Sequence, residues 1–168
     1  MKRVETIDHY PYHPQGFVRS RSTRYNDDGK IVEVLSGGKN NLVVTTSRDS
    51  FATLLTDPNN HDYLIRYFAM GQGHHAVGDP NTPIPPVLSD TALEDEQFRK
   101  NYTSASYPDA RSVEYYTKVG LTEANDHLWY SECALFSDTV MFSINVPSTG
   151  AWVKNDHLEI EFWWRIVF

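Results

Sequence analysis

The segment from Leu158 to Phe168 constrains the fold more than any other part of the chain. Apolar side chains occupy every second position over these eleven residues: Leu158, Ile160, Phe162, Trp164, Ile166 and Phe168. A period of two is typical of a strand with one face on the core and the other toward solvent. Burying the six side chains contributes about 10–15 kcal/mol before entropy is counted, at about 1.5–3 kcal/mol each. The segment is therefore predicted to be structural, and its deletion to unfold the domain.

Other runs of β-branched and aromatic residues predict further strands. They cover residues 30–36, 41–46, 63–70, 112–119, 128–136 and 139–146. Turns are expected at residues 26–29, at 37–40 and at 137–138.

The helical signal is confined to two short segments. Phe51, Leu54 and Leu55 have helical spacing within residues 48–56, and a helical turn is expected near residues 92–98. We therefore predict a mainly β fold, an antiparallel β-sandwich of jelly-roll-like form with one or two short helices.

Residues 1–28 show neither period and include Pro11, Pro14 and Gly16. Proline fixes φ and removes a donor, which favours an extended N-terminal arm ahead of a sandwich domain over residues 29–168. The arm carries five basic and four acidic groups, net +1, which leaves −8 on the rest of a chain of net charge −7. An arm of this charge is suited to docking on the acidic body of a neighbouring subunit, and an ordinary solvated tail is an equal alternative.

Composition disfavours several classes of partner. The net charge of −7 does not favour phosphate binding, so no nucleic-acid partner is expected. No apolar run approaches the roughly 20 residues of a membrane span, and the N-terminus lacks a signal-peptide core. Cys133 is the single cysteine, so no disulfide within the chain is expected and the protein is expected to be made in a cytosol.

Residues 71–89 predict a long ordered loop, which contains Pro80, Pro83, Pro85 and Pro86. Ordered loops of that length are usually functional.

No group of residues predicts chemistry. His74, His75 and Asp79 are ligand-type residues, but adjacent imidazoles in a loop point apart, so no metal is assigned. The glycines that begin at Gly71 do not match a dinucleotide fingerprint. No cofactor and no enzymatic activity are expected, with a glycan hydrolase weighed as a third hypothesis.

Glu132 lies in an otherwise apolar strand, and a buried acid needs a partner. We expect a structural ion pair between Glu132 and Arg99, with Arg111 as the other possible partner. The acidic residues at 90, 94 and 96 are read as structural, with Arg99 able to pair with Glu96.

The order of several short motifs resembles a family of small tailed-phage virion proteins of the tail, collar and fibre-anchoring type. The matching residues are Asn41-Leu42-Val43-Val44, Phe51-Ala52-Thr53-Leu54-Leu55, Phe68-Ala69-Met70-Gly71-Gln72-Gly73, Ser89-Asp90-Thr91-Ala92-Leu93 with Glu96 and Arg99, Glu132-Cys133-Ala134-Leu135-Phe136, Met141-Phe142-Ser143 and Lys154. Ala134 stands where the family often has glycine. The chain ends at Phe168 with no stalk after it, which favours a connector, collar or baseplate component over a receptor-binding fibre.

The resemblance implies a non-enzymatic virion protein that is made in the host cytoplasm and assembles with itself, as a ring, and with other virion proteins. The expected interface residues are Tyr10, Tyr12, Phe17, Arg19, Arg21, Arg24, His74, His75, Pro83, Pro85 and Pro86. The main alternative is a carbohydrate-binding module for host glycans, in which Trp152, joined by Trp129 and Trp163, stacks on sugar rings. A capsid decoration protein is a further alternative.

Overall fold

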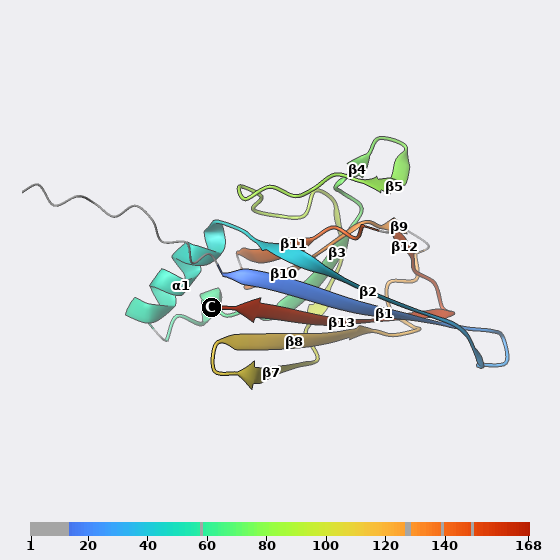
Figure 1. Ribbon diagram of the computed structural model, residues 1–168, viewed down its shortest axis with the longest axis horizontal. Coiled ribbons are helices and arrows are strands. Elements are labelled where there is room, and N and C mark those ends of the chain that lie inside the picture. Colours follow the sequence, from blue (N-terminus) through green and yellow to red (C-terminus); the bar gives the residue numbers. More distant parts are fainter. Residues whose placement is uncertain (1–13, 58, 127–128, 139, 149) are drawn as a thin grey trace, which may run out of the picture.

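The computed structural model describes residues 14–57, 59–126, 129–138, 140–148 and 150–168, and within them the fold is mainly β (Figure 1). Nine of the described strands form one curled antiparallel sheet. In spatial order they are β6 (Glu96–Asn101), β3 (Tyr67–Gly71), β10 (Glu132–Phe136), β11 (Met141–Asn145), β2 (Ile31–Val43), β1 (Gln15–Tyr25), β13 (Leu158–Val167), β8 (Ser112–Val119) and β7 (Ser104–Asp109).

Two short strand pairs and the helical segments complete the described fold. The pairs are β4 (His75–Ala76) with β5 (Asp79–Pro83), and β9 (Trp129–Tyr130) with β12 (Trp152–Val153). The α-helix α1 (Thr46–Thr56) follows β2 and lies at one end of the sheet, and a 3-10 turn covers His61–Tyr63.

Strand β13 confirms the prediction made from its alternating sequence as far as Ile166, whereas Phe168, which was expected on the buried face, lies beyond the strand and is 52% exposed. It lies between β1 and β8, and the side chains of Ile160, Phe162 and Ile166 are fully buried. The intervening residues, such as Trp163 and Arg165, are only partly buried. Burial of every second side chain is what the period of two requires of a strand in a curled sheet.

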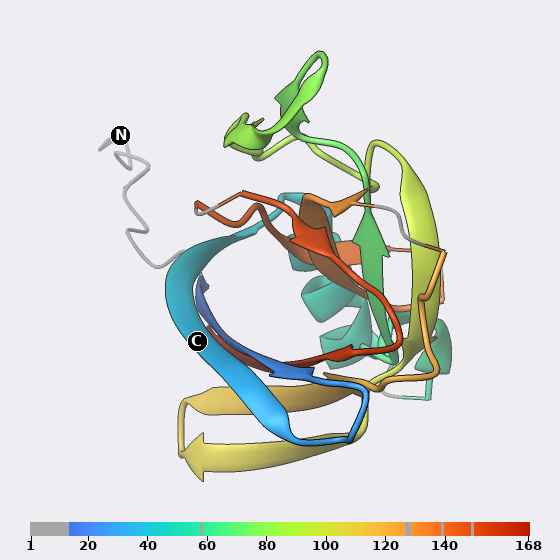
Figure 2. The ribbon, with the colours of Figure 1, turned by 90° about the vertical axis from the view of Figure 1, so that its right-hand side faces the viewer.

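The curl brings the two halves of the sheet face to face over the main core (Figure 2). Phe68 of β3 packs against Phe162 of β13, with ring centroids 4.6 Å apart, and its edge approaches Trp164. Phe142 of β11 and Leu135 of β10 belong to the same cluster. One continuous core therefore holds strands that are distant in the chain.

The two edges of the sheet, β6 and β7, are consecutive in the chain. Tyr102 and Thr103 join them: the amide of Tyr102 donates to the carbonyl of Arg66, and the amide of Thr103 donates to that of Tyr116. The chain thus passes directly from one edge of the curl to the other, and this link holds the two edges together.

The outer face of β3, β10 and β11 carries a second apolar cluster, which includes Ala69, Ala134 and Met141. Leu93, from the segment between β5 and β6, packs into this cluster. The amide of Thr45 also donates to the carbonyl of Leu88 in that segment. The second half of the loop that follows β3 is therefore part of the fold and covers one face of the sheet.

The predicted N-terminal arm, residues 1–28, includes residues that belong to the sheet. Gln15–Tyr25 is not an arm but the central strand β1, paired with β2 on one side and β13 on the other. Its inward positions include Ser20 and Ser22, which are small and polar, so the alternation is invisible to a search for apolar residues. The expected division into an arm of residues 1–28 and a domain of residues 29–168 is therefore wrong, because the domain includes β1.

Two further local predictions are wrong. Residues 37–40 are not a turn, because β2 runs unbroken through them, and the turn lies at Asn26–Gly29, where the sequence also indicated one. A side chain at Gly38 would meet the ring of Phe17 at 2.8 Å, so glycine serves close strand packing here. The expected helical turn at residues 92–98 is instead a bend that leads into β6.

Replacement of Trp164 with alanine should lower the free energy of unfolding by about 3–5 kcal/mol, because it leaves a cavity against Phe68. Val167→Ala in the same strand, where the side chain is 39% exposed, should change it by less than about 0.5 kcal/mol. Urea denaturation of both variants measures the difference, and equal effects would contradict this description of the core.

Candidate functional site

The buried carboxylate of Glu132 fixes the base of the long loop between β3 and β6. Glu132 begins β10 and is fully buried. Its Oε1 accepts hydrogen bonds from the amides of Gly73 and Asp95, at 2.9 and 3.1 Å. Its Oε2 accepts from the amide of Glu94 at 3.2 Å and lies 2.8 Å from Nδ1 of His74. Both ends of the loop therefore converge on one carboxylate.

The glycines at the start of the loop give it room to approach Glu132. A Cβ at Gly73 would stand 2.7 Å from Oε1 of Glu132, and one at Gly71 would overlap the same oxygen. The short motifs at residues 71–73, 90–95 and 132 are thus brought together at one buried point, although each is far from the others in sequence.

His74 is the second element of this site and is 5% exposed. Its backbone lies in the left-handed region, with φ of 56°, which turns the side chain inward. Nδ1 faces Glu132, and Nε2 lies 3.2 Å from Oδ2 of Asp90. The amide of His74 donates to Oε2 of Glu94 at 2.6 Å. Two carboxylates therefore face the imidazole, and a third binds the backbone amide of the same residue.

The environment shifts the pKa values of this pair in opposite directions. The hydrogen bond with Glu132 raises the pKa of His74 above its ordinary value of 6.5, against the opposing effect of burial. Burial by itself would raise the pKa of Glu132. The bond with His74 and the three backbone N–H groups outweigh that effect, and they lower the pKa of Glu132 below its usual 4.5. The arrangement favours an ionised pair that holds the loop.

The expected ion pair between Arg99 and Glu132 does not form. Arg99 lies opposite Ala69 in the β3–β6 ladder, with its guanidinium 4.1 Å from the centroid of the Phe136 ring. Its Nε and Nη2 donate to the two carboxylate oxygens of Glu96, at 2.7 and 2.6 Å. The buried acid has a partner, as expected, but the partners are His74 and backbone amides.

The basic residues predicted for an interface on β1 are engaged within the sheet. Arg19 contacts Glu114, and Nε of Arg21 donates to Glu161 at 2.7 Å, with both guanidinium groups within 5.8 Å of the Trp163 ring. Arg24 pairs with Glu33. Phe17 is 39% exposed over Gly38, and Tyr10 and Tyr12 lie outside the described residues.

The loop residues predicted for an interface differ in exposure. His74 is buried in the Glu132 site, and the imidazole Nδ1 of the half-buried His75 lies 2.9 Å from the carbonyl of Ala76. Pro85 is exposed, whereas Pro83 and Pro86 are half-buried. The exposed apolar side chains beside them were not predicted: Val77, Ile84, Val87 and Leu88.

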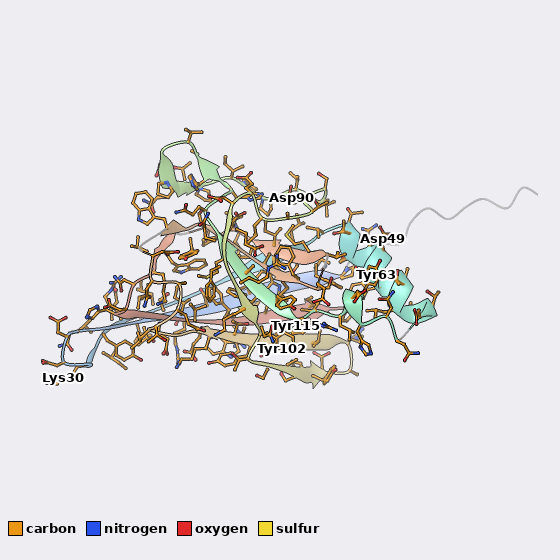
Figure 3. The ribbon with its side chains drawn as sticks, turned by 180° about the vertical axis from the view of Figure 1, so that it is seen from behind. Lys30, Asp49, Tyr63, Asp90, Tyr102 and Tyr115 are labelled. Atoms are coloured by element: carbon orange, nitrogen blue, oxygen red, sulfur yellow. The ribbon has the colours of Figure 1, made fainter. Side chains whose placement is uncertain are left out.

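Strand β2 has a long free edge. It pairs with β1 from Ile31 to Asn41, but its other edge pairs only with β11, at Leu42 and Val43. No described residue pairs with that edge between Ile31 and Asn40. Four apolar side chains in this part of β2 are 51–60% exposed: Ile31, Val32, Val34 and Leu35. The labelled Lys30 marks the tip of this hairpin, which projects from the body of the molecule (Figure 3).

A cleft of about 450 Å³ runs beside this free edge. One wall is β2 from Leu35 to Lys39, the floor is the inner face of β1 at Val18, Ser20 and Ser22, and the other wall is the segment from Asn145 to Trp152. Asn145 lines this region, and its Nδ2 is buried and has no hydrogen-bond partner among the described residues. The small side chains of the floor leave open the space that Phe and Trp fill in the rest of the core.

The tryptophans do not form the joint surface that glycan stacking requires. Trp152 lines the cleft and packs edge-on against Phe162, with ring centroids 5.4 Å apart. Trp163 follows Phe162 in β13 and therefore lies on the opposite face, against Tyr116. Trp129, 49% exposed, does not line the cleft.

Lys154 is, after Glu132, the second buried charged residue among the motifs that resemble the virion proteins. Its ammonium group donates to Oδ1 of Asn125 and to the carbonyl of Asn155, both at 2.8 Å. Burial lowers the pKa of Lys154 to about 8. These bonds fix the loop before β13, which is a structural role.

Comparison with known proteins gives no match to a protein-family model, to a curated protein or to a solved structure. Within the described residues, no three histidine, cysteine, aspartate or glutamate side chains are arranged to hold a metal ion. No helix in the described ranges is long and apolar enough to cross a membrane. The candidate site consists of the loop held at Glu132 and the free edge of β2.

Glu132→Gln should lower the free energy of unfolding by about 3 kcal/mol, because the new amide cannot accept all four hydrogen bonds and removes the charge that faces Nδ1 of His74. Glu33→Gln, at a carboxylate 48% exposed, should change it by less than about 0.5 kcal/mol. Chemical denaturation of the two variants provides the comparison. A loss for Glu132→Gln as small as that of the control would show that the carboxylate does not hold the loop.

The Glu132–His74 pair should stabilise the protein most between about pH 4.5 and 6.5. The raised pKa of His74 gives stability that is complete below 6.5 and is lost as pH rises through the folded value. The lowered pKa of Glu132 gives stability that is present above 4.5 and is lost as pH falls through the folded value.

Urea unfolding measured at pH 6.5 and at higher pH should show the loss of stability in the wild type and a smaller loss in His74→Gln. Since all other titrating groups are common to both proteins, the difference reports on His74. Parallel profiles would contradict the assigned role.

Proposed function

We propose that this protein is a structural component of a tailed-phage virion, located in the tail, collar or baseplate, that assembles as a multimer and links neighbouring virion proteins. The observation that carries the proposal is the free edge of β2 with its exposed apolar side chains. A long edge strand of this kind is an aggregation hazard unless a partner covers it.

The loop beyond β3 supports the same role. Glu132 anchors both of its ends in the sheet, and Val77 and Val87 are exposed between them. A loop with a fixed base loses less entropy when a partner binds than a loose one does. Two apolar surfaces on one domain suit a protein that acts by contact with more than one neighbour.

The motif order that resembles small tailed-phage virion proteins gives the proposal its setting in the particle. Gly73, Asp90 and Glu132, which belong to three of those motifs, contribute to the Glu132 site, and this supports the proposal that the pattern serves to present the loop. We include in the proposal that the two facing halves of the curled sheet are a jelly-roll-like sandwich. The protein would be made in the host cytoplasm and function in the virion.

The proposal predicts that mass spectrometry of purified particles detects this chain in a fixed multiple copy number. Val34→Lys should reduce its incorporation roughly tenfold, which corresponds to about 1.4 kcal/mol of contact free energy. The physical reason is that a lysine on the exposed face of β2 opposes burial against a neighbour.

Val167→Lys is the matched control, because it makes the same change at an exposed valine away from β2 and the loop. Both variants should remain folded by circular dichroism. Absence of the chain from purified particles, or equal incorporation of the two variants, would overturn the proposal.

A further inference from the structure

The free edge of β2 and the cleft beside it together leave room for one additional strand next to β2. Along the edge, β11 fills the neighbouring position in the sheet only at Leu42 and Val43, and it then separates from β2. Beyond that point the cleft takes its place, between β2 and the segment that carries Trp152. A strand added to β2 there would gain backbone hydrogen bonds along the edge, and every second side chain would enter the cleft.

The lining of the cleft suits such side chains. Its floor is formed by the small residues Ser20 and Ser22 with Val18, and Gly37 stands opposite Ser20. About 450 Å³ is room for several aliphatic or β-branched side chains. Asn145, whose buried Nδ2 has no partner among the described residues, lies where the β2–β11 ladder ends, at the start of the cleft.

We propose that residues 2–10 of a second copy of this chain form the added strand on the free edge of β2. This run, Lys-Arg-Val-Glu-Thr-Ile-Asp-His-Tyr, contains neither proline nor glycine and ends at Pro11. Its Val4, Thr6, Ile7 and Tyr10 are residue types that strands favour. The inference deepens the proposed function, because it names the contact by which copies join.

The length and starting point of the segment fit a neighbouring copy. Thirteen residues precede the described part of the chain and span at most about 45 Å when extended, whereas ten residues of strand edge measure about 33 Å. The described part of the chain begins next to Gly16, which pairs with Asn41 of β2 and with Ile166 of β13. The free edge of the same copy lies on the opposite side of β2 from β1, behind the β2–β11 pairing at Leu42 and Val43, whereas the edge of a second copy can be approached directly.

The test compares the full-length wild type with Ile7→Pro and with the matched control His13→Pro, which places proline outside residues 2–10. Proline removes a backbone donor and is excluded from a paired strand. Sedimentation equilibrium measures the mass, and amide hydrogen exchange measures protection along residues 31–40 of β2.

The wild type and His13→Pro should form an oligomer with protected β2 amides. Ile7→Pro should shift toward the monomer mass and lose protection there by tenfold or more, with exchange in β13 unchanged. Equal mass and equal β2 protection in Ile7→Pro would overturn the inference, as would a monomeric wild type, whether its β2 amides are protected by its own segment or exposed.

The outcome is separable from that of the proposed function. If Ile7→Pro leaves β2 protection unchanged but the chain is still found in particles at fixed copy number, the strand exchange is wrong and the virion role stands. If the wild-type chain is absent from particles, the virion role fails whatever the exchange data show.

Discussion

The ionised carboxylate of Glu132, buried and bonded to three backbone amides and to His74, is the interaction on which the rest of the structure depends. An uncompensated charge in this position would be strongly destabilising, so the loop amides must stay where they are. Through them the carboxylate fixes the segment that covers the second apolar cluster at Leu93. It also fixes the base from which the exposed part of the loop projects.

Sequence patterns predicted the elements whose inward face is large and apolar. Strand β13 was evident because Phe162 and Trp164 alternate with partly exposed residues, and β8 was predicted with its observed bounds. Helix α1 was expected from Phe51 and its neighbours, although Leu55 proved 86% exposed. Where burial of large side chains determines an element, the period of the pattern is sufficient to find it.

The other elements and the candidate site depend on contacts that cannot be read from the pattern of side chains along the chain. Strand β1 escaped notice because its inward face has Ser20 and Ser22, and Gly38 indicated a turn although its role is to accommodate Phe17. The need of Glu132 for partners was predicted, but the partners are mostly main-chain amides brought in by a loop of unpredictable path. The free edge of β2 is likewise a property of strand order, which no local pattern reports.

The pairing of β1 with β13 has a consequence for how the molecule forms. These central neighbours are joined, for example, by Arg21 and Glu161, which are 140 residues apart. During synthesis the outer edges of the β1–β2 hairpin stay unpaired until almost all of the chain between β2 and β13 has been made. Topologies dominated by such distant contacts fold slowly and expose sticky intermediates. The free edge of β2 that favours association of the folded protein thus also favours aggregation of the incomplete chain. The fraction of chains that fold would then depend on chaperone binding and on the speed of translation.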